Sequence, residues 1–208
     1  MIPTTAFLPR LLPYLIGCPQ PMALQALVDS AISFCEASLV IRQRLDRQLT
    51  ALGQAEFDIG ATSQQTVTRV LKVWLDGVEI YAAAADTVDD QVITPARPRT
   101  FYTLPDDSGL MAVLYPVPDR AYTLDVEAAL KPTRDATSLH SDLFDTWLEG
   151  VVEGAKARLM AIPDQPFSNP AAAQFSALQA ASMAKKARIE GAFGRVQGSL
   201  SIRPRPFA

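Results

Sequence analysis

The sequence has few of the residues on which enzyme chemistry depends. Among 208 residues there is one histidine, His140, and there are two cysteines, Cys18 and Cys35. No metal-binding histidine pair or Gly-x-Ser-x-Gly motif occurs, and no glycine-rich loop opens a predicted helix as nucleotide binding requires. Enzymes need proton carriers, nucleophiles or metal ligands that are held close together. The sequence therefore predicts a protein with no catalytic residues, no metal and no cofactor.

The sequence also lacks an apolar run of the ~20 residues that a membrane span needs. Residues 1–17 are apolar, but they lack a basic start and contain Pro3, Pro9 and Pro13, so they do not resemble a signal peptide. Two cysteines are too few for a disulfide framework and are typical of a reducing cytoplasm. We therefore expect synthesis in the cytoplasm and no membrane partner.

Charge is low overall but unevenly distributed. The formal net charge is −3, which excludes the whole chain as a typical nucleic-acid binder. From residue 185 to the end there are six basic residues and one acid, so this end carries +5 and the rest −8. Such asymmetry is typical of a contact segment.

Three segments have helical signals. Pro19 and Pro21 open a helix over about 21–40, with Cys35 on its apolar face as a buried small side chain. A second helix is predicted from near Ser138 to Pro163. Within it, Gly150 and Gly154 imply that another backbone crosses close by. Asn169 and Pro170 begin a third helix in the preferred capping order, and its apolar positions are taken to be Phe175, Leu178, Ala181, Ser182 and Ile189. Gly191, Gly194 and Gly198 are expected to break it.

The middle of the chain has strand character. Residues 67–75 are rich in β-branched and aromatic side chains, and Asp76-Gly77 predicts a tight hairpin to residues 78–80. An earlier hairpin is predicted between 44–49 and 55–59 around Gly53. Three later runs, 100–104, 110–115 and 122–129, are predicted to form an antiparallel meander. For 82–98 we expect a loop with a turn of helix.

Together these patterns predict an α+β fold. One N-terminal and two C-terminal long helices form a helical bundle, with an inserted antiparallel β-sandwich or barrel-like region and an extended C-terminal tail. The expected divisions are 1–40 for the N-terminal segment and helix, 41–135 for the β-rich insert, 136–194 for the C-terminal helices and 195–208 for the tail.

Polar residues on the helices are interpreted structurally. We expect His140 to serve the start of its helix rather than to act as an acid, base or ligand. Four carboxylates follow one helix face: Asp142, Asp145, Glu149 and Glu153. Such a row is typical of a solvated surface rather than a metal site. Lys185, Lys186 and Arg188 could bind phosphate or interact with the helix C-terminus through its dipole.

Several stretches resemble the head-to-tail adaptor (connector) proteins of tailed bacteriophages. The opening is similar in Leu12-Pro13-Tyr14-Leu15, Gly17-Cys18-Pro19, Ala23–Leu27 and Ala31–Glu36. The return from strand to helix is similar in Tyr122–Pro132 and Leu143–Trp147, with Gly150 and Ala155, and the last helix in Asn169-Pro170, Ala172 and Phe175. These are packing and capping residues, not a catalytic signature.

The resemblance implies a non-enzymatic structural subunit of the virion neck. It implies a self-assembled ring, commonly a dodecamer, that docks on the portal protein, extends the DNA channel and meets tail or tail-completion proteins. Genomic DNA would pass without sequence-specific contact. A row of acids facing the channel would help DNA slide, since like charges repel. We therefore assign the four-carboxylate row to the channel as a hypothesis.

The C-terminal tail is the expected portal contact. In such rings a C-terminal extension reaches into the portal, and here Arg203 and Arg205 alternate with prolines between Ile202 and Phe207. Arginines suit acidic partners, and the two apolar residues would be anchors. Because the tail is expected to be unstructured and no large apolar surface is evident, we expect the free chain to be mostly monomeric or weakly oligomeric and to become a ring only on the portal. Other virion ring proteins, such as a tail-completion or tail-tube component, and less readily a small-molecule-binding domain, stay open as alternatives.

Overall fold

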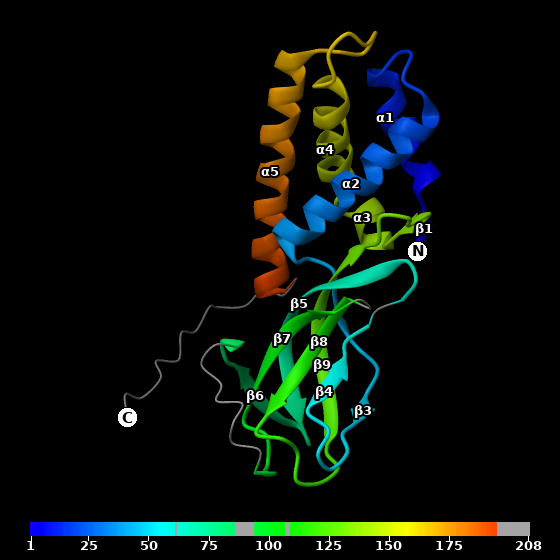
Figure 1. Cartoon of the computed structure of the whole chain (residues 1–208). Helices are drawn as coiled ribbons and strands as arrows, with labels where there is room; N and C mark the ends of the chain where they lie inside the picture. Colours follow the sequence, from blue (N-terminus) through cyan, green and yellow to red (C-terminus); the bar gives the residue numbers. More distant parts are fainter. Residues whose placement is uncertain (61, 86–93, 107–108, 195–208) are drawn as a thin grey trace.

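The computed structural model describes residues 1–60, 62–85, 94–106 and 109–194. The predicted tail, 195–208, and the middle of the predicted 82–98 loop lie outside the described residues. A layer of helices sits above a curled β-sheet (Figure 1), which confirms the α+β class. The chain enters the helical layer, passes through the sheet and returns to the helices.

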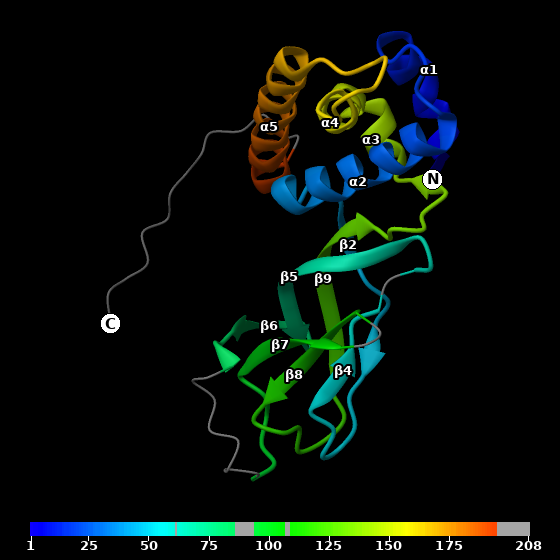
Figure 2. The ribbon, with the colours of Figure 1, turned by 45° about the horizontal axis from the view of Figure 1, so that its top comes forward.

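The helical layer is built from both ends of the chain. α4 and α5 lie side by side and α2 crosses them, with α1 on the far side of α4 from α5 (Figures 1 and 2). A short β-pair joins the N-terminus to the start of the C-terminal helices through Ile2↔Leu139. The helices and the strands of this pair are β1 (Ile2–Pro3), η1 (Thr4–Phe7), α1 (Leu8–Leu11), η2 (Leu12–Tyr14), α2 (Gln20–Ser38), β10 (Ser138–Leu139), α3 (Ser141–Asp145), α4 (Leu148–Met160) and α5 (Pro170–Phe193).

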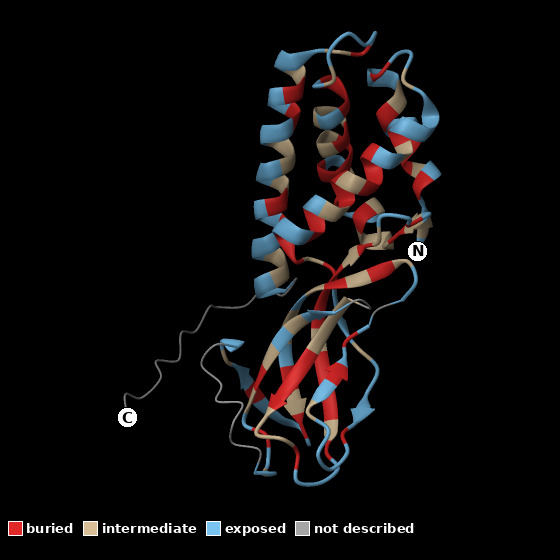
Figure 3. Ribbon diagram, viewed as in Figure 1, coloured by how far each residue is buried: buried red, intermediate tan, exposed pale blue. Residues whose placement is uncertain are grey.

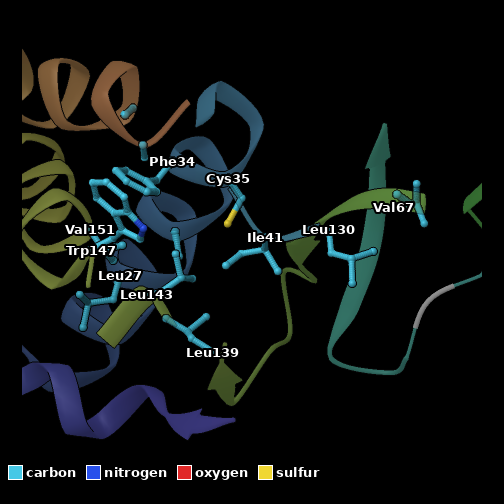
Figure 4. Packing of buried hydrophobic residues seen from close by; sticks show 14 of the residues in the cluster. Leu27, Phe34, Cys35, Ile41, Val67, Leu130, Leu139, Leu143, Trp147 and Val151 are labelled. Carbon is cyan, nitrogen blue, oxygen red and sulfur yellow. The ribbon is translucent and has the colours of Figure 1, made fainter. Parts of the chain in front are cut away.

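α2 confirms the predicted first helix to within two residues. Pro19 precedes it with an extended backbone, Pro21 lies in its first turn, and Leu39 ends it in a left-handed conformation, φ 51°. Cys35 is fully buried, as predicted. Its neighbours in the core include Phe34 and Trp147, whose rings are 5.9 Å apart between centroids (Figure 4).

The predicted second helix is wrong in one respect, because it is two helices. α3 ends at Asp145 and α4 begins at Leu148. Between them the Trp147 backbone leaves helical geometry, with φ −115° and ψ 18°, while its indole is buried. Burial of this large ring therefore accompanies the break.

Gly150 and Gly154 lie where α2 and α5 press against α4. A Cβ on Gly150 would stand 2.6 Å from Phe34 of α2 and 3.3 Å from Met183 of α5. A Cβ on Gly154 would collide with the Ser30 hydroxyl. The close approach predicted from these glycines is confirmed, although side chains rather than a bare backbone fill the space.

α5 begins as predicted but ends later. The Asn169 side chain accepts a hydrogen bond from the Ala172 N–H at 3.1 Å, and Pro170 occupies the first turn. The predicted break at Gly191 is wrong, since the helix continues to Phe193 and Gly194 follows with φ 72°. A Cβ added to Gly191 would stand 3.5 Å from the Val40 Cα. α5 therefore packs against the segment that follows α2.

The sheet is one curled half-barrel rather than a two-layer sandwich. Its strand order is β2-β9-β5-β6-β7-β8-β4, and β3 also pairs with β9. The predicted hairpin at Asp76-Gly77 is confirmed, with φ 49° and 76° at these residues. The strands are β2 (Arg42–Arg44), β3 (Gln48–Leu49), β4 (Glu56–Asp58), β5 (Gln65–Leu75), β6 (Val78–Ala82), β7 (Thr100–Asp106), β8 (Gly109–Tyr115) and β9 (Thr123–Pro132).

Two predicted strand pairings are wrong. The runs 44–49 and 55–59 contain strands, but β2 and β3 pair with β9 and β4 pairs with β8. The meander stops after the β7–β8 hairpin, because β9 pairs along β5 instead of β8. The sheet also has one parallel pair, β6 with β7. β9 thus lies between β5 and the early strands and holds the sheet together.

One core runs from the helices into the sheet. Ile41 and Leu130 lie in the contact zone between α2 and β9, next to Cys35 and Leu139 (Figure 4). Buried positions extend from the helical layer into both ends of β5 and along β9 (Figure 3). Helical layer and sheet therefore share a single hydrophobic cluster.

Candidate functional site

The few chemically active side chains have structural surroundings. The His140 Nδ1 accepts a hydrogen bond from the Asp142 N–H at 3.2 Å and so caps α3, which confirms the helix-terminus role. Burial lowers the pKa of His140, and the nearby Asp142 carboxylate opposes this shift. Burial, and secondarily Glu36, raises the pKa of the Cys35 thiol to about 12, so it stays protonated and unreactive. Within the described ranges, no three His, Cys, Asp or Glu side chains gather as a metal site.

The predicted acidic row is divided between α3 and α4. Asp142 is half-buried and accepts a hydrogen bond from the Thr146 hydroxyl at 3.0 Å. Glu153 forms an ion pair with Lys156 at 2.8 Å, and only 17% of its side chain is exposed. Asp145 and Glu149 are exposed. Two of the four carboxylates thus face solvent freely, and the assignment of the row to a channel stays a prediction.

The basic residues of α5 do not stabilise its own C-terminus, since the helix runs past them to Phe193. The Arg188 guanidinium instead donates a hydrogen bond to the Ala37 carbonyl at 3.3 Å, near the end of α2. Lys186 lies 3.9 Å from Glu190 on the same helix. The predicted portal contacts, Ile202, Arg203, Arg205 and Phe207, lie outside the described residues.

A polar groove of about 560 Å³ marks the junction of the helical layer and the sheet. Lys131 of β9 forms an ion pair with Glu36 of α2 at 2.6 Å across this junction. The Arg158 guanidinium of α4 donates to the Ser33 hydroxyl at 2.6 Å and to the Asp29 carbonyl at 3.4 Å. These bonds tie α2 to α4 and to β9, and they engage three of the six charged side chains that line the groove.

The outer surface of α5 differs from the sequence-based prediction. The predicted apolar positions of this helix do not face the core: its fully buried positions carry small side chains, Ala173, Ser176, Ala184 and Ala187, and Met183 packs partly buried beside Gly150. Large apolar residues point outward with more than half of their surface exposed: Phe175 62%, Leu178 72%, Ile189 58% and Phe193 59%. Exposed positions follow the outer side of α5 in Figure 3. The expectation of no large apolar surface is therefore wrong.

A sequence signal for this arrangement does exist. Alanine and serine recur at helical spacing along α5, and the two glycines of α4 require small neighbours. When the packed side of a helix is lined by small residues, its larger residues must lie elsewhere. The exposed face could have been found by pairing these two patterns.

The described surfaces of the chain are suited to contact with other proteins. In the described part of the chain no helix is long and apolar enough to cross a membrane. A continuous core, ion pairs across the junction and an apolar outer helix face are features of a rigid protein that binds other proteins.

Comparison with known proteins agrees with this picture. No curated protein sequence matches the chain significantly. The family model described as SU10 adaptor protein matches residues 8–203, nearly the whole length. A phage adaptor of this kind is a structural component of the virion that contacts other virion proteins. The chain belongs to the SU10 adaptor protein family, as its resemblance to phage head-to-tail adaptors predicted.

Proposed function

We propose that this chain is a subunit of a ring, twelvefold by analogy with the resembled adaptors, that docks on the portal protein and extends the DNA channel towards the tail. The family match over residues 8–203 carries this proposal. It spans both the helical layer and the sheet, so the whole fold is engaged in the adaptor role. Genomic DNA passes through the ring without sequence-specific contacts.

The described geometry suits such a role. A channel wall must keep its shape while DNA passes and must not bind the DNA. The hydrophobic core shared by the helices and the sheet, together with the ion pair across their junction, gives this rigidity. The formal charge of −3 limits sticking to DNA phosphates, because most of the negative charge lies before residue 185. Asp145 and Glu149, both exposed, are the proposed channel-facing carboxylates.

The tail supplies the proposed portal contact. Its sequence places Arg203 and Arg205 between Ile202 and Phe207, with prolines that limit the entropy lost on docking. Arginine side chains bind acidic groups in a bidentate manner, and the apolar pair gives anchors. Partners on the other side are tail or tail-completion proteins.

The proposal is tested by deleting the gene for this chain from the phage that carries it. We expect DNA-filled heads without tails, and heads that lose DNA, since the channel would end at the portal. Adding the purified chain should restore tail attachment, and electron microscopy of the restored particles should show a ring below the portal. Tailed, infectious particles made without the chain would refute the proposal.

A further inference from the structure

The outer face of α5 is a stripe that crosses the full length of the helix. We define it by Phe175, Leu178, Ser182, Lys185, Ile189 and Phe193, which recur at steps of three or four residues. Such steps place side chains on one side of a helix. The buried positions of α5 lie on the opposite side. No described part of the chain covers the stripe.

The exposed apolar area on α5 matches the largest patch of a typical monomer, which is often a functional surface. Four large apolar side chains are 58 to 72% exposed, which leaves on the order of 400 Å² of apolar surface on one helix. The stripe runs through 18 residue steps, about 27 Å along the axis. A stable interface buries about 800 Å² on each partner. The stripe is therefore long and apolar enough to be the centre of one.

A second exposed apolar cluster lies at the other edge of the helical layer. The segment that joins α1 to α2 exposes Tyr14 to 61% and Ile16 to 80%, and Met22 in the first turn of α2 is 39% exposed. Both ribbon views place α5 on one side of α4 and this segment on the other side (Figures 1 and 2). A closed ring needs two different surfaces on opposite sides of each subunit.

Charge disfavours a symmetric pairing of two α5 faces. Two copies of α5 face to face would bring Lys185 and Lys186 of each copy together, and like charges repel. A contact between α5 and a different surface of the next copy avoids this repulsion.

We infer that the outer face of α5 receives the α1–α2 edge of the next copy of this chain. This inference rests on the proposed ring and assigns its subunit contact. The edge of one copy covers the stripe of its neighbour through Tyr14, Ile16 and Met22. These side chains contact Phe175 and Leu178 or, further along the stripe, Ile189 and Phe193. Each subunit then uses both surfaces, and repetition of the contact closes the ring.

The first test is cross-linking in assembled particles. Leu178→Cys and Met22→Cys are placed in one chain that also carries Cys18→Ser, and a flexible bismaleimide is added. Cys35 is buried and does not compete. We expect a ladder of cross-linked multimers, because each copy carries both surfaces. Either single-cysteine chain alone should give no multimers, and a mixture of the two should stop at dimers.

Other results overturn the inference. Dimers from Leu178→Cys alone would place α5 against α5. A product that joins Leu178→Cys to a different virion protein would give the stripe to that protein. In both cases the chain is still in the particle, so the proposed function survives. If the unaltered chain is absent from particles, the proposed function fails as well.

The second test asks whether the stripe is needed. Phe175→Ser with Leu178→Ser should lower incorporation into particles at least tenfold without changing the melting temperature, since both side chains are exposed. The matched control is Leu49→Ser with Leu52→Ser, which removes side chains that are 73% and 67% exposed on the sheet region. The control should incorporate normally. Equal incorporation of both double variants would overturn the inference.

Discussion

The packing of α4 against α2 predicts that the effect of Gly154→Ala on the free energy of unfolding depends on the residue at position 30. Gly154→Ala should gain about 1 kcal/mol of helix propensity. However, the new Cβ would collide with the Ser30 hydroxyl, which donates a hydrogen bond of 2.7 Å to the Val151 carbonyl. Overpacking costs about 1–3 kcal/mol and the displaced hydrogen bond about 1 kcal/mol. We expect Gly154→Ala to lower the free energy of unfolding by about 1–3 kcal/mol.

Removing the hydroxyl should remove the penalty. In Ser30→Ala the nearest atoms to a Cβ at residue 154 become the Cβ of residue 30, at 3.4 Å, and the Cβ of Ala180, at 3.7 Å, which are ordinary contacts. Ser30→Ala alone should lose about 1 kcal/mol with its hydrogen bond. The double variant should unfold close to wild type, because the propensity gain offsets that loss. The two changes are then coupled by about 2–4 kcal/mol.

Urea unfolding of the four proteins, followed by circular dichroism, measures this coupling. Gly191→Ala is the matched control: it also lies in a helix, but its added Cβ meets nothing closer than 3.5 Å. It should be neutral or stabilising by up to about 1 kcal/mol. Additive effects of the two changes at residues 30 and 154, within about 0.5 kcal/mol, would refute the packing argument.

Four further outcomes are expected. Asn169→Ala should lower stability by about 1 kcal/mol in urea unfolding, since it removes the cap of α5. Burial lowers the pKa of His140, so protonation favours the unfolded chain; stability should be full above pH ~6.5 and fall below it. His140→Asn keeps a capping acceptor and should lose less stability between pH 7 and 5 than wild type; equal losses would contradict this. Asp145→Lys with Glu149→Lys should leave melting unchanged, because exposed charges contribute little, yet impair DNA retention or ejection; unaltered infectivity would make them a plain solvated face. Deleting 199–208 should leave the melting temperature unchanged and abolish attachment to portal-bearing heads; normal decoration of the heads would exclude the tail from docking.

Local signals in the sequence predicted local structure well. Asp76-Gly77 predicted its hairpin because both turn positions need positive φ, and both have it. Asn169-Pro170 predicted the start of α5 because a cap and a first-turn proline act on the adjacent backbone alone. His140 at a helix start followed from the same kind of reasoning. Each of these features depends on contacts within a few residues.

Pairings between distant segments could not be predicted in this way. β9 pairs with β2, β3 and β5, and nothing in its own alternation specifies which strands lie beside it. The orientation of α5 was wrong for a related reason. Larger apolar residues usually face the core, but α4 approaches closely at Gly154, where α5 presents Ala180, and the fully buried positions of α5 carry only alanine and serine. The partner helix, not the periodicity, decides which face is inside.

The two-ended construction of the helical layer has a consequence for synthesis on the ribosome. α2 is made early, but α4 and α5, against which it packs, follow only after the sheet region. At 5–20 residues per second, the roughly 100 residues in between take about 5–20 s to translate. During that interval the sheet can fold once β9 has emerged from the ribosome. The apolar side of α2 stays exposed in the nascent chain until α4 and α5 have been made. A product truncated before α4 would therefore lack a completed helical layer.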